Sequence, residues 1–147
     1  MQKDHIRDYA TEAFRYYASL GRPTYEELKR FYYKRAMDEY EKGKERGSNV
    51  SRPTENQILY AENRLQEKMA ELHDILAVER TLKQLHEFEL EAVEAVYFVN
   101  ASKPIKRNEI SERVLNCCND LYCDVRTIYR YLNKARMIFA YERGLRR

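Results

Sequence analysis

Hydrophobic positions in the first part of the chain repeat at helical spacing. Apolar and aromatic residues of "HIRDYATEAFRYYAS", residues 5–19, recur three or four positions apart, which predicts an amphipathic helix. The stretch "LGRPT" interrupts this pattern, and Thr24 can cap a second helix that ends near Gly43. Glycine, serine, asparagine and proline then mark residues 43–53 as a linker. We therefore expect residues 1–50 to form a tyrosine-rich helical hairpin that leads into this linker.

The segment after the linker contains no helix-breaking residue as far as Leu85. Its spacing predicts one long helix, or two helices joined near Glu79, with the apolar stripe Ile58, Ala61, Leu65, Leu72, Ile75 and Leu82. Residues 51–80 are thus expected to form a connecting helix. Because such a stripe needs a cover, this segment is the candidate contact for a homodimer, although the N-terminal helices of the same chain could cover it equally well.

Three more helices are predicted in the last part of the chain, over residues 87–100, 106–121 and 124–144. Scarce helix breakers, 4 Gly and 3 Pro, agree with an all-α fold. In a helix-turn-helix unit two helices pack together, and this packing holds the second helix rigid in the major groove. Residues 81–147 are therefore expected to be a DNA-binding domain of this type. The apolar positions expected to form its core are Leu82, Leu85, Leu90, Val93, Val96, Tyr97, Ile110, Val114, Leu115, Val125, Ile128, Leu132, Ala135 and Phe139.

The last of these helices begins with "DVRTIYRYLNKA", residues 124–135, where cations and tyrosines interrupt an apolar stripe. Asp124 can cap the helix, which would put Arg126 in the first turn, where helix-turn-helix proteins meet base edges. Arg126 and Arg130 lie one turn apart and can each bind guanine or phosphate. The full set of expected DNA-binding residues is Arg126, Thr127, Tyr129, Arg130, Asn133, Lys134, Lys106 and Arg107.

Charge is unevenly distributed along the chain. The net charge is only +3, yet the segment from Lys103 onward carries 11 basic and 5 acidic residues, so the rest of the chain is net negative. A basic C-terminal segment favours a polyanionic partner, here double-stranded DNA. The 13 tyrosines are expected mainly in the core and at interfaces.

The segments "VERTLKQLHEFELEAVEAVYFVN", "EISERV" and "DVRTIYRYLNKA" together resemble region 4 of bacterial sigma factors. They resemble still more closely the sigma-like late-transcription regulators of phages in Gram-positive bacteria, the RinA and ArpU type. This resemblance covers residues 78–145 and implies sequence-specific promoter binding and control of transcription; it leaves open a contact with RNA polymerase. Arg126, Thr127, Arg130 and Lys134 match the recognition helix of that family. The stretch "LNCCNDLYC", after "EISERV", is longer than the sigma pattern has.

Other functions receive less support from the residues. The chain has no glycine-rich phosphate loop, serine elbow or HExxH motif, so we expect neither an enzyme nor a cofactor. Cys117, Cys118 and Cys123 lack a nearby fourth ligand, and we expect thiols rather than a metal site. Two alternatives to a regulator remain: a DNA-packaging protein like the small subunit of a phage terminase, and a helical protein-interaction module. A ring of eight or more subunits would favour packaging.

The expected location is the cytoplasm, without a membrane partner. No stretch approaches the roughly 20 apolar residues that span a bilayer. The N-terminus "MQKDHIRDYA" lacks the apolar core of a secretion signal, and an odd number of cysteines suits a reducing compartment.

Overall fold

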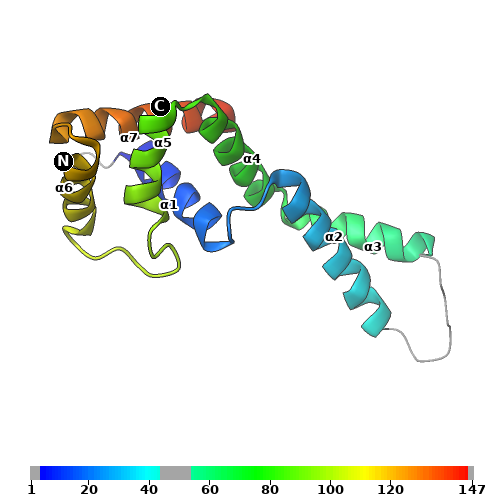
Figure 1. Ribbon diagram of the computed structural model, residues 1–147. Helices are drawn as coiled ribbons and strands as arrows, with labels where there is room; N and C mark the ends of the chain where they lie inside the picture. The colour runs from blue at the N-terminus through cyan, green and yellow to red at the C-terminus, as the bar shows by residue number, and fades with distance from the viewer. Residues whose placement is uncertain (1–3, 44–53, 146–147) are drawn as a thin grey trace. The chain divides into compact units, whose positions relative to one another are not determined.

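The computed structural model describes residues 4–43 and 54–145, and every regular element in these ranges is helical (Figure 1). The expected all-α class is therefore confirmed. None of the helices in the described part has the length and apolar character needed to cross a membrane. Most of the predicted linker, residues 44–53, lies outside the described residues. The elements are α1 (His5–Ser19), α2 (Tyr25–Lys42), α3 (Glu55–Glu67), α4 (Met69–Gln84), α5 (Glu87–Val93), the π-helical segment η1 (Glu94–Phe98), α6 (Glu109–Leu121) and α7 (Val125–Arg143).

The chain divides into two compact units, and helix α4 belongs partly to each. The larger unit combines the described residues up to Pro23 with those from Asp74 onward, and the smaller unit comprises Thr24–His73. This division differs from the expected domains 1–50, 51–80 and 81–147. Helix α1 packs on η1 and α7 within the larger unit.

Aromatic side chains from three elements form the centre of the larger unit. Phe14 of α1 stacks on Tyr97 of η1, with ring centroids 5.6 Å apart and planes 4° apart. Phe14 also lies 5.6 Å from Phe139 of α7, and none of the three is more than 1% exposed. Burying a side chain of this size contributes about 1.5–3 kcal/mol. This contribution explains why α1 joins Tyr97 and Phe139, which lie more than 80 residues from Phe14 in the chain.

The smaller unit is a hairpin of α2 and α3, which pack side by side. Thr24 caps α2 as expected, because its hydroxyl accepts a hydrogen bond of 3.1 Å from the backbone N–H of Glu27. Ala36 and Ala61 are buried, and small side chains at such positions let two helices approach closely.

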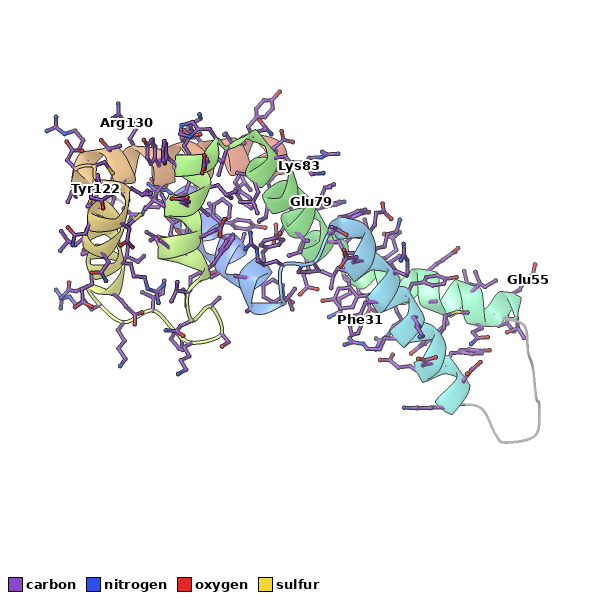
Figure 2. All side chains as sticks on the ribbon, viewed as in Figure 1. Phe31, Glu55, Glu79, Lys83, Tyr122 and Arg130 are labelled. Atoms are coloured by element: carbon purple, nitrogen blue, oxygen red, sulfur yellow. The ribbon has the colours of Figure 1, made fainter. Side chains whose placement is uncertain are left out.

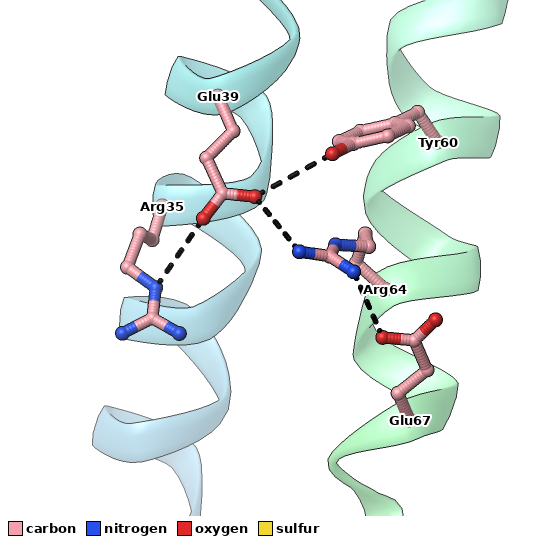
Figure 3. Close-up of polar contacts among 5 residues, drawn as sticks. All are labelled: Arg35, Glu39, Tyr60, Arg64 and Glu67. Carbon is pink, nitrogen blue, oxygen red and sulfur yellow. Dashed lines mark hydrogen bonds and ion pairs between the residues drawn. The ribbon is translucent and has the colours of Figure 1, made fainter.

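Polar contacts line one side of this hairpin (Figure 3). The carboxylate of Glu39 lies 3.8 Å from Arg35, 3.4 Å from Arg64 and 3.5 Å from the hydroxyl of Tyr60. Arg64 in turn pairs with Glu67 at 3.1 Å. These groups are partly exposed, so the ion pairs add little to stability; the contacts of Glu39 with Tyr60 and Arg64 join α2 to α3.

The predicted long helix of residues 51–80 is two helices. The break falls at Lys68, between α3 and α4, and α4 continues through Glu79, where a junction was expected. Ala61, Leu72 and Ile75 of the predicted apolar stripe are all 0% exposed within the single chain. These three positions therefore do not need a second chain to cover them.

Two arginine side chains anchor the backbone where η1 ends. Arg15 of α1, only 8% exposed, donates hydrogen bonds to the carbonyl oxygens of Tyr97 at 3.4 Å and Asn100 at 3.1 Å, and to that of Lys103. Arg113 of α6 donates to the carbonyl oxygen of Val96 at 2.7 Å. The last carbonyl groups of a helix lack hydrogen-bond donors within it. The guanidinium groups of Arg15 and Arg113 supply such donors to the carbonyl oxygens of Tyr97 and Val96.

Candidate nucleic-acid interface

Helix α7 is held along one face by the core of the larger unit. Ile128, Leu132, Ala135 and Phe139 are each 0% exposed, so four of the five residues of the predicted stripe are buried. Asp124 caps the helix, since its carboxylate accepts a 2.8 Å hydrogen bond from the backbone N–H of Thr127. Burial of one stripe and capping of the first turn fix the direction in which the opposite face points.

Helix α6 approaches α7 through a short turn. It continues to Leu121, so only three residues, Tyr122 to Asp124, lie between the two helices. The stretch that seemed too long in the sequence is thus mostly helix. Val114 and Cys117 of α6 are 1% and 2% exposed, and α6 packs on α7. Two packed helices joined by a three-residue turn have the connection length of helix-turn-helix units.

Two residues predicted to be in the core face outward. Leu115 is 54% exposed and Val125 is 39% exposed, so both predictions are wrong. On α6 the buried face follows Val114 and Cys117, which are one turn apart, and Leu115 points away from it. Val125 is the first residue of α7, where the chain has only just left the turn.

The exposed face of α7 carries Arg126, Arg130 and Asn133, at a spacing of four and then three residues. Arg130 makes one long hydrogen bond, of 3.4 Å, to the hydroxyl of Thr127. The pKa of Asp124 is lowered by hydrogen bonds from Thr127 and by the nearby charges of Arg126 and Arg130. The first two turns of α7 therefore present two arginine side chains to solvent beside the Asp124 carboxylate.

Lys134 has a partner that the sequence did not reveal. Its ammonium group lies 2.8 Å from one carboxylate oxygen of Glu89 in α5 and 2.9 Å from the other. Burial would raise the pKa of the Glu89 carboxyl, but hydrogen bonds from Lys134 and the backbone N–H of His86 outweigh burial and lower it. Lys134 thus stabilises the unit, and its ammonium is less available to a phosphate than that of an unpaired lysine.

Tyr129 follows Arg126 by three residues in α7, so the two side chains are neighbours on the helix surface. It is 40% exposed and, together with Tyr97, Leu132 and Arg136, lines a cavity of about 530 Å³ beside α1. The hydroxyl of Tyr97 accepts a 2.7 Å hydrogen bond from Arg136. Tyr129 therefore borders both this cavity and the arginine-bearing face of α7.

Lys106 and Arg107 are exposed at the opposite end of α6 from the turn. Helix α6 has 13 residues, a length of about 20 Å at 1.5 Å per residue. These two cations and the arginine pair of α7 therefore form two clusters rather than one. A ligand that touches both must be extended, as a nucleic-acid backbone is.

Several cations of the basic C-terminal segment form ion pairs or hydrogen bonds within the larger unit. Arg143 lies 2.6 Å from Asp74, and Arg113, 11% exposed, pairs with Glu109 at 3.4 Å. With Lys134 and Arg136, four of the bases counted from the sequence thus have partners in the fold. Exposed cations remain at Lys103, Lys106, Arg107, Arg126 and Arg130.

The three cysteines are free thiols close to the turn. Burial, with smaller effects from Cys123 and Cys118, raises the pKa of Cys117 to about 11, so this thiol stays protonated at neutral pH. Within residues 4–43 and 54–145, no group of three or more histidine, cysteine, aspartate or glutamate side chains is placed to hold a metal ion.

Comparisons of the chain with protein-family models, with curated proteins and with solved structures give no match. The geometry of α6 and α7 therefore carries the functional argument.

Proposed function

We propose that the larger unit binds duplex DNA through α6 and α7, and that the protein regulates transcription by this binding. One observation carries the proposal: α7 is fixed by a fully buried stripe while Arg126 and Arg130 are exposed in its first two turns, directly after a three-residue turn. In helix-turn-helix proteins the first turns of the second helix enter the major groove, where arginine is the commonest partner of guanine.

The clusters at the two ends of α6 support the same proposal. Phosphate contacts position a protein on DNA while base contacts select the sequence. Arg126 and Arg130 would read bases, and Lys106 and Arg107 would contact a phosphate backbone about 20 Å away. The role in transcription rests on the resemblance of residues 78–145 to sigma-like regulators.

The test compares two arginine variants of the full chain. A 30-base-pair duplex is first selected by the wild-type protein from a random-sequence pool, and affinity is then measured by fluorescence anisotropy. Arg130→Ala should cost about 1–3 kcal/mol of binding free energy. The matched control is Arg80→Ala in α4, which removes the same charge from a side chain that is 56% exposed, and it should leave affinity within about twofold. Equal affinities of Arg130→Ala and wild type, with unchanged circular dichroism, would show that α7 does not bind DNA through this face.

A further inference from the structure

Tyr122 occupies a backbone conformation that tyrosine rarely adopts. It ends α6 with φ 54° and ψ 46°, in the left-handed region, where a side chain is unfavourable and glycine is preferred. The backbone N–H groups of Tyr122 and Cys123 both donate to the carbonyl oxygen of Cys118, so the turn needs this conformation. It does not need the phenol ring.

Tyr122 is 95% exposed. Within the part of the chain that the structure describes, its hydroxyl makes no hydrogen bond and its ring no aromatic or cation contact. The phenol therefore contributes little to the stability of the fold.

Other left-handed positions of the chain differ from Tyr122. The C-terminal end of α7 uses Gly144, with φ 76°, and Asn100 and Asn108 are of a residue type that tolerates this region. Arg22, with φ 60°, lies 4.9 Å from the ring of Phe98 and 3.6 Å from Glu94, so its side chain has intramolecular contacts. Among these described residues, Tyr122 combines a strained backbone with a side chain that stabilises nothing. Such an outlier indicates a function outside the fold.

The position of Tyr122 indicates what it touches. It precedes the capping residue Asp124 by two positions and Arg126 by four, and Figure 2 shows Tyr122 and Arg130 at the same end of the larger unit, where α6 meets α7. If the first turns of α7 enter a groove, the turn that precedes them lies at the edge of that groove, beside the sugar–phosphate backbone.

We propose that Tyr122 is a binding residue for the DNA backbone: its hydroxyl donates a hydrogen bond to a phosphate oxygen, and its ring lies against the adjoining deoxyribose. This inference rests on the proposed function. A phenol is a neutral hydrogen-bond donor, and tyrosine is among the residues that contact phosphates in protein–DNA complexes.

The decisive variant is Tyr122→Gly, because strain and contact predict opposite effects. Glycine relieves the left-handed strain, so the melting temperature should rise by about 2–4 °C. Affinity for the selected 30-base-pair duplex should nevertheless fall by about 10- to 50-fold, since both the hydrogen bond and the ring contact are lost. A residue with a merely structural role would not separate stability from affinity in this way.

Two further variants isolate the hydroxyl. Tyr122→Phe keeps the ring and should lose about tenfold in affinity, with an unchanged salt dependence because a neutral donor releases no counterion. The control is Tyr141→Phe, which removes the hydroxyl from another tyrosine, 83% exposed near the far end of α7, and should bind like wild type.

Each outcome decides between the alternatives. Wild-type affinity in both Tyr122→Gly and Tyr122→Phe, while Arg130→Ala binds weakly, overturns this inference and leaves the proposed function standing. Wild-type affinity in all three variants overturns both. If Tyr122→Gly is destabilised instead, Tyr122→Phe decides, and undiminished binding of that variant overturns the contact.

Discussion

The ammonium group of Lys134 lies 2.8 Å from Glu89, a carboxylate whose side chain is only 4% exposed. This contact joins the outer side of α7 to the first turn of α5. The same carboxylate accepts a 3.1 Å hydrogen bond from the backbone N–H of His86, so Glu89 links the start of α5 to the proposed recognition helix. A buried carboxylate needs such partners, because an unpaired charge in the interior is costly.

Removing the lysine should therefore destabilise the larger unit. Lys134→Met leaves Glu89 buried without its cation, and we expect the free energy of unfolding to fall by about 1–3 kcal/mol; the value is below that of a fully buried pair because the side chain of Lys134 is 49% exposed. Urea unfolding followed by circular dichroism measures the change. The neighbouring variant Asn133→Ala, on the exposed face, should stay within about 0.5 kcal/mol of wild type. Equal stability of both variants would contradict the role of the ion pair.

The same carboxylate makes stability depend on pH. Because the pKa of Glu89 is lower in the folded protein than in the unfolded chain, its ionised form stabilises the fold above the unfolded pKa, and this contribution is lost as the pH falls through the folded pKa. Glu89→Gln should thus be less stable than wild type at pH 7, and the difference should shrink as the pH falls below about 4. Parallel thermal melts between pH 2.5 and pH 7 test this. A difference that is constant over the whole range would mean that Glu89 does not titrate in this window.

Burial separates two β-branched residues at the start of α7. Ile128 is 0% exposed and Val125 is 39% exposed, although the sequence predicted both in the core. Ile128→Asp puts a charge into the interior and should cost several kcal/mol, enough to unfold the larger unit. Val125→Asp should change stability by less than about 1 kcal/mol. Thermal unfolding of both variants gives the comparison, and similar melting temperatures would mean that the helical phase of α7 is misassigned.

Available cations, rather than all cations, should set the salt dependence of DNA binding. The segment from Lys103 onward has 11 bases, which would give a slope of log affinity against log salt near −10 if each neutralised a phosphate. If four or five of the exposed cations at Lys103, Lys106, Arg107, Arg126 and Arg130 each neutralise a phosphate, the slope should be about −3.5 to −4.5. Titrations of a 30-base-pair duplex at several salt concentrations measure it, and Arg126→Ala should reduce its magnitude by about 1. A slope near zero would exclude phosphate contacts.

Local patterns of the sequence predicted more than its long-range contacts. The cap at Asp124 and the buried stripe that includes Ile128 depend on residues within a few turns of one helix; the cap was predicted correctly, and so was the stripe except at Val125. The packing of Phe14 on Phe139 joins residues far apart in the chain, which spacing alone cannot reveal. The sequence could not predict which cations are paired, for the same reason. Lys134 has the pattern of an exposed lysine, and only the position of Glu89 in the fold shows that the two form an ion pair. The strain at Tyr122 likewise could not be predicted, because only the structure gives its backbone angles.

Arg15 supplies a test of how α1 supports the basic loop before α6. Its guanidinium donates to the carbonyl oxygens of Tyr97, Asn100 and Lys103, and so fixes the segment that leads to Lys106. Arg15→Met removes these donors while keeping an unbranched apolar stem, and should lower the free energy of unfolding by about 1–3 kcal/mol. Arg15→Lys should recover only part of the loss, because an ammonium group lacks the planar fork that reaches separate carbonyls.

The effect of Arg15→Met should also be local. Hydrogen exchange of backbone amides should accelerate most in residues 97–108, because that segment loses its anchor, and much less at the centre of α7, where Ile128 and Leu132 stay buried. Duplex affinity should fall by less than about tenfold, since the arginine pair of α7 is held by other contacts. Exchange that accelerates equally in both regions would mean that Arg15 stabilises the unit as a whole rather than positioning this loop, and unchanged exchange in residues 97–108 would mean that the loop does not depend on it.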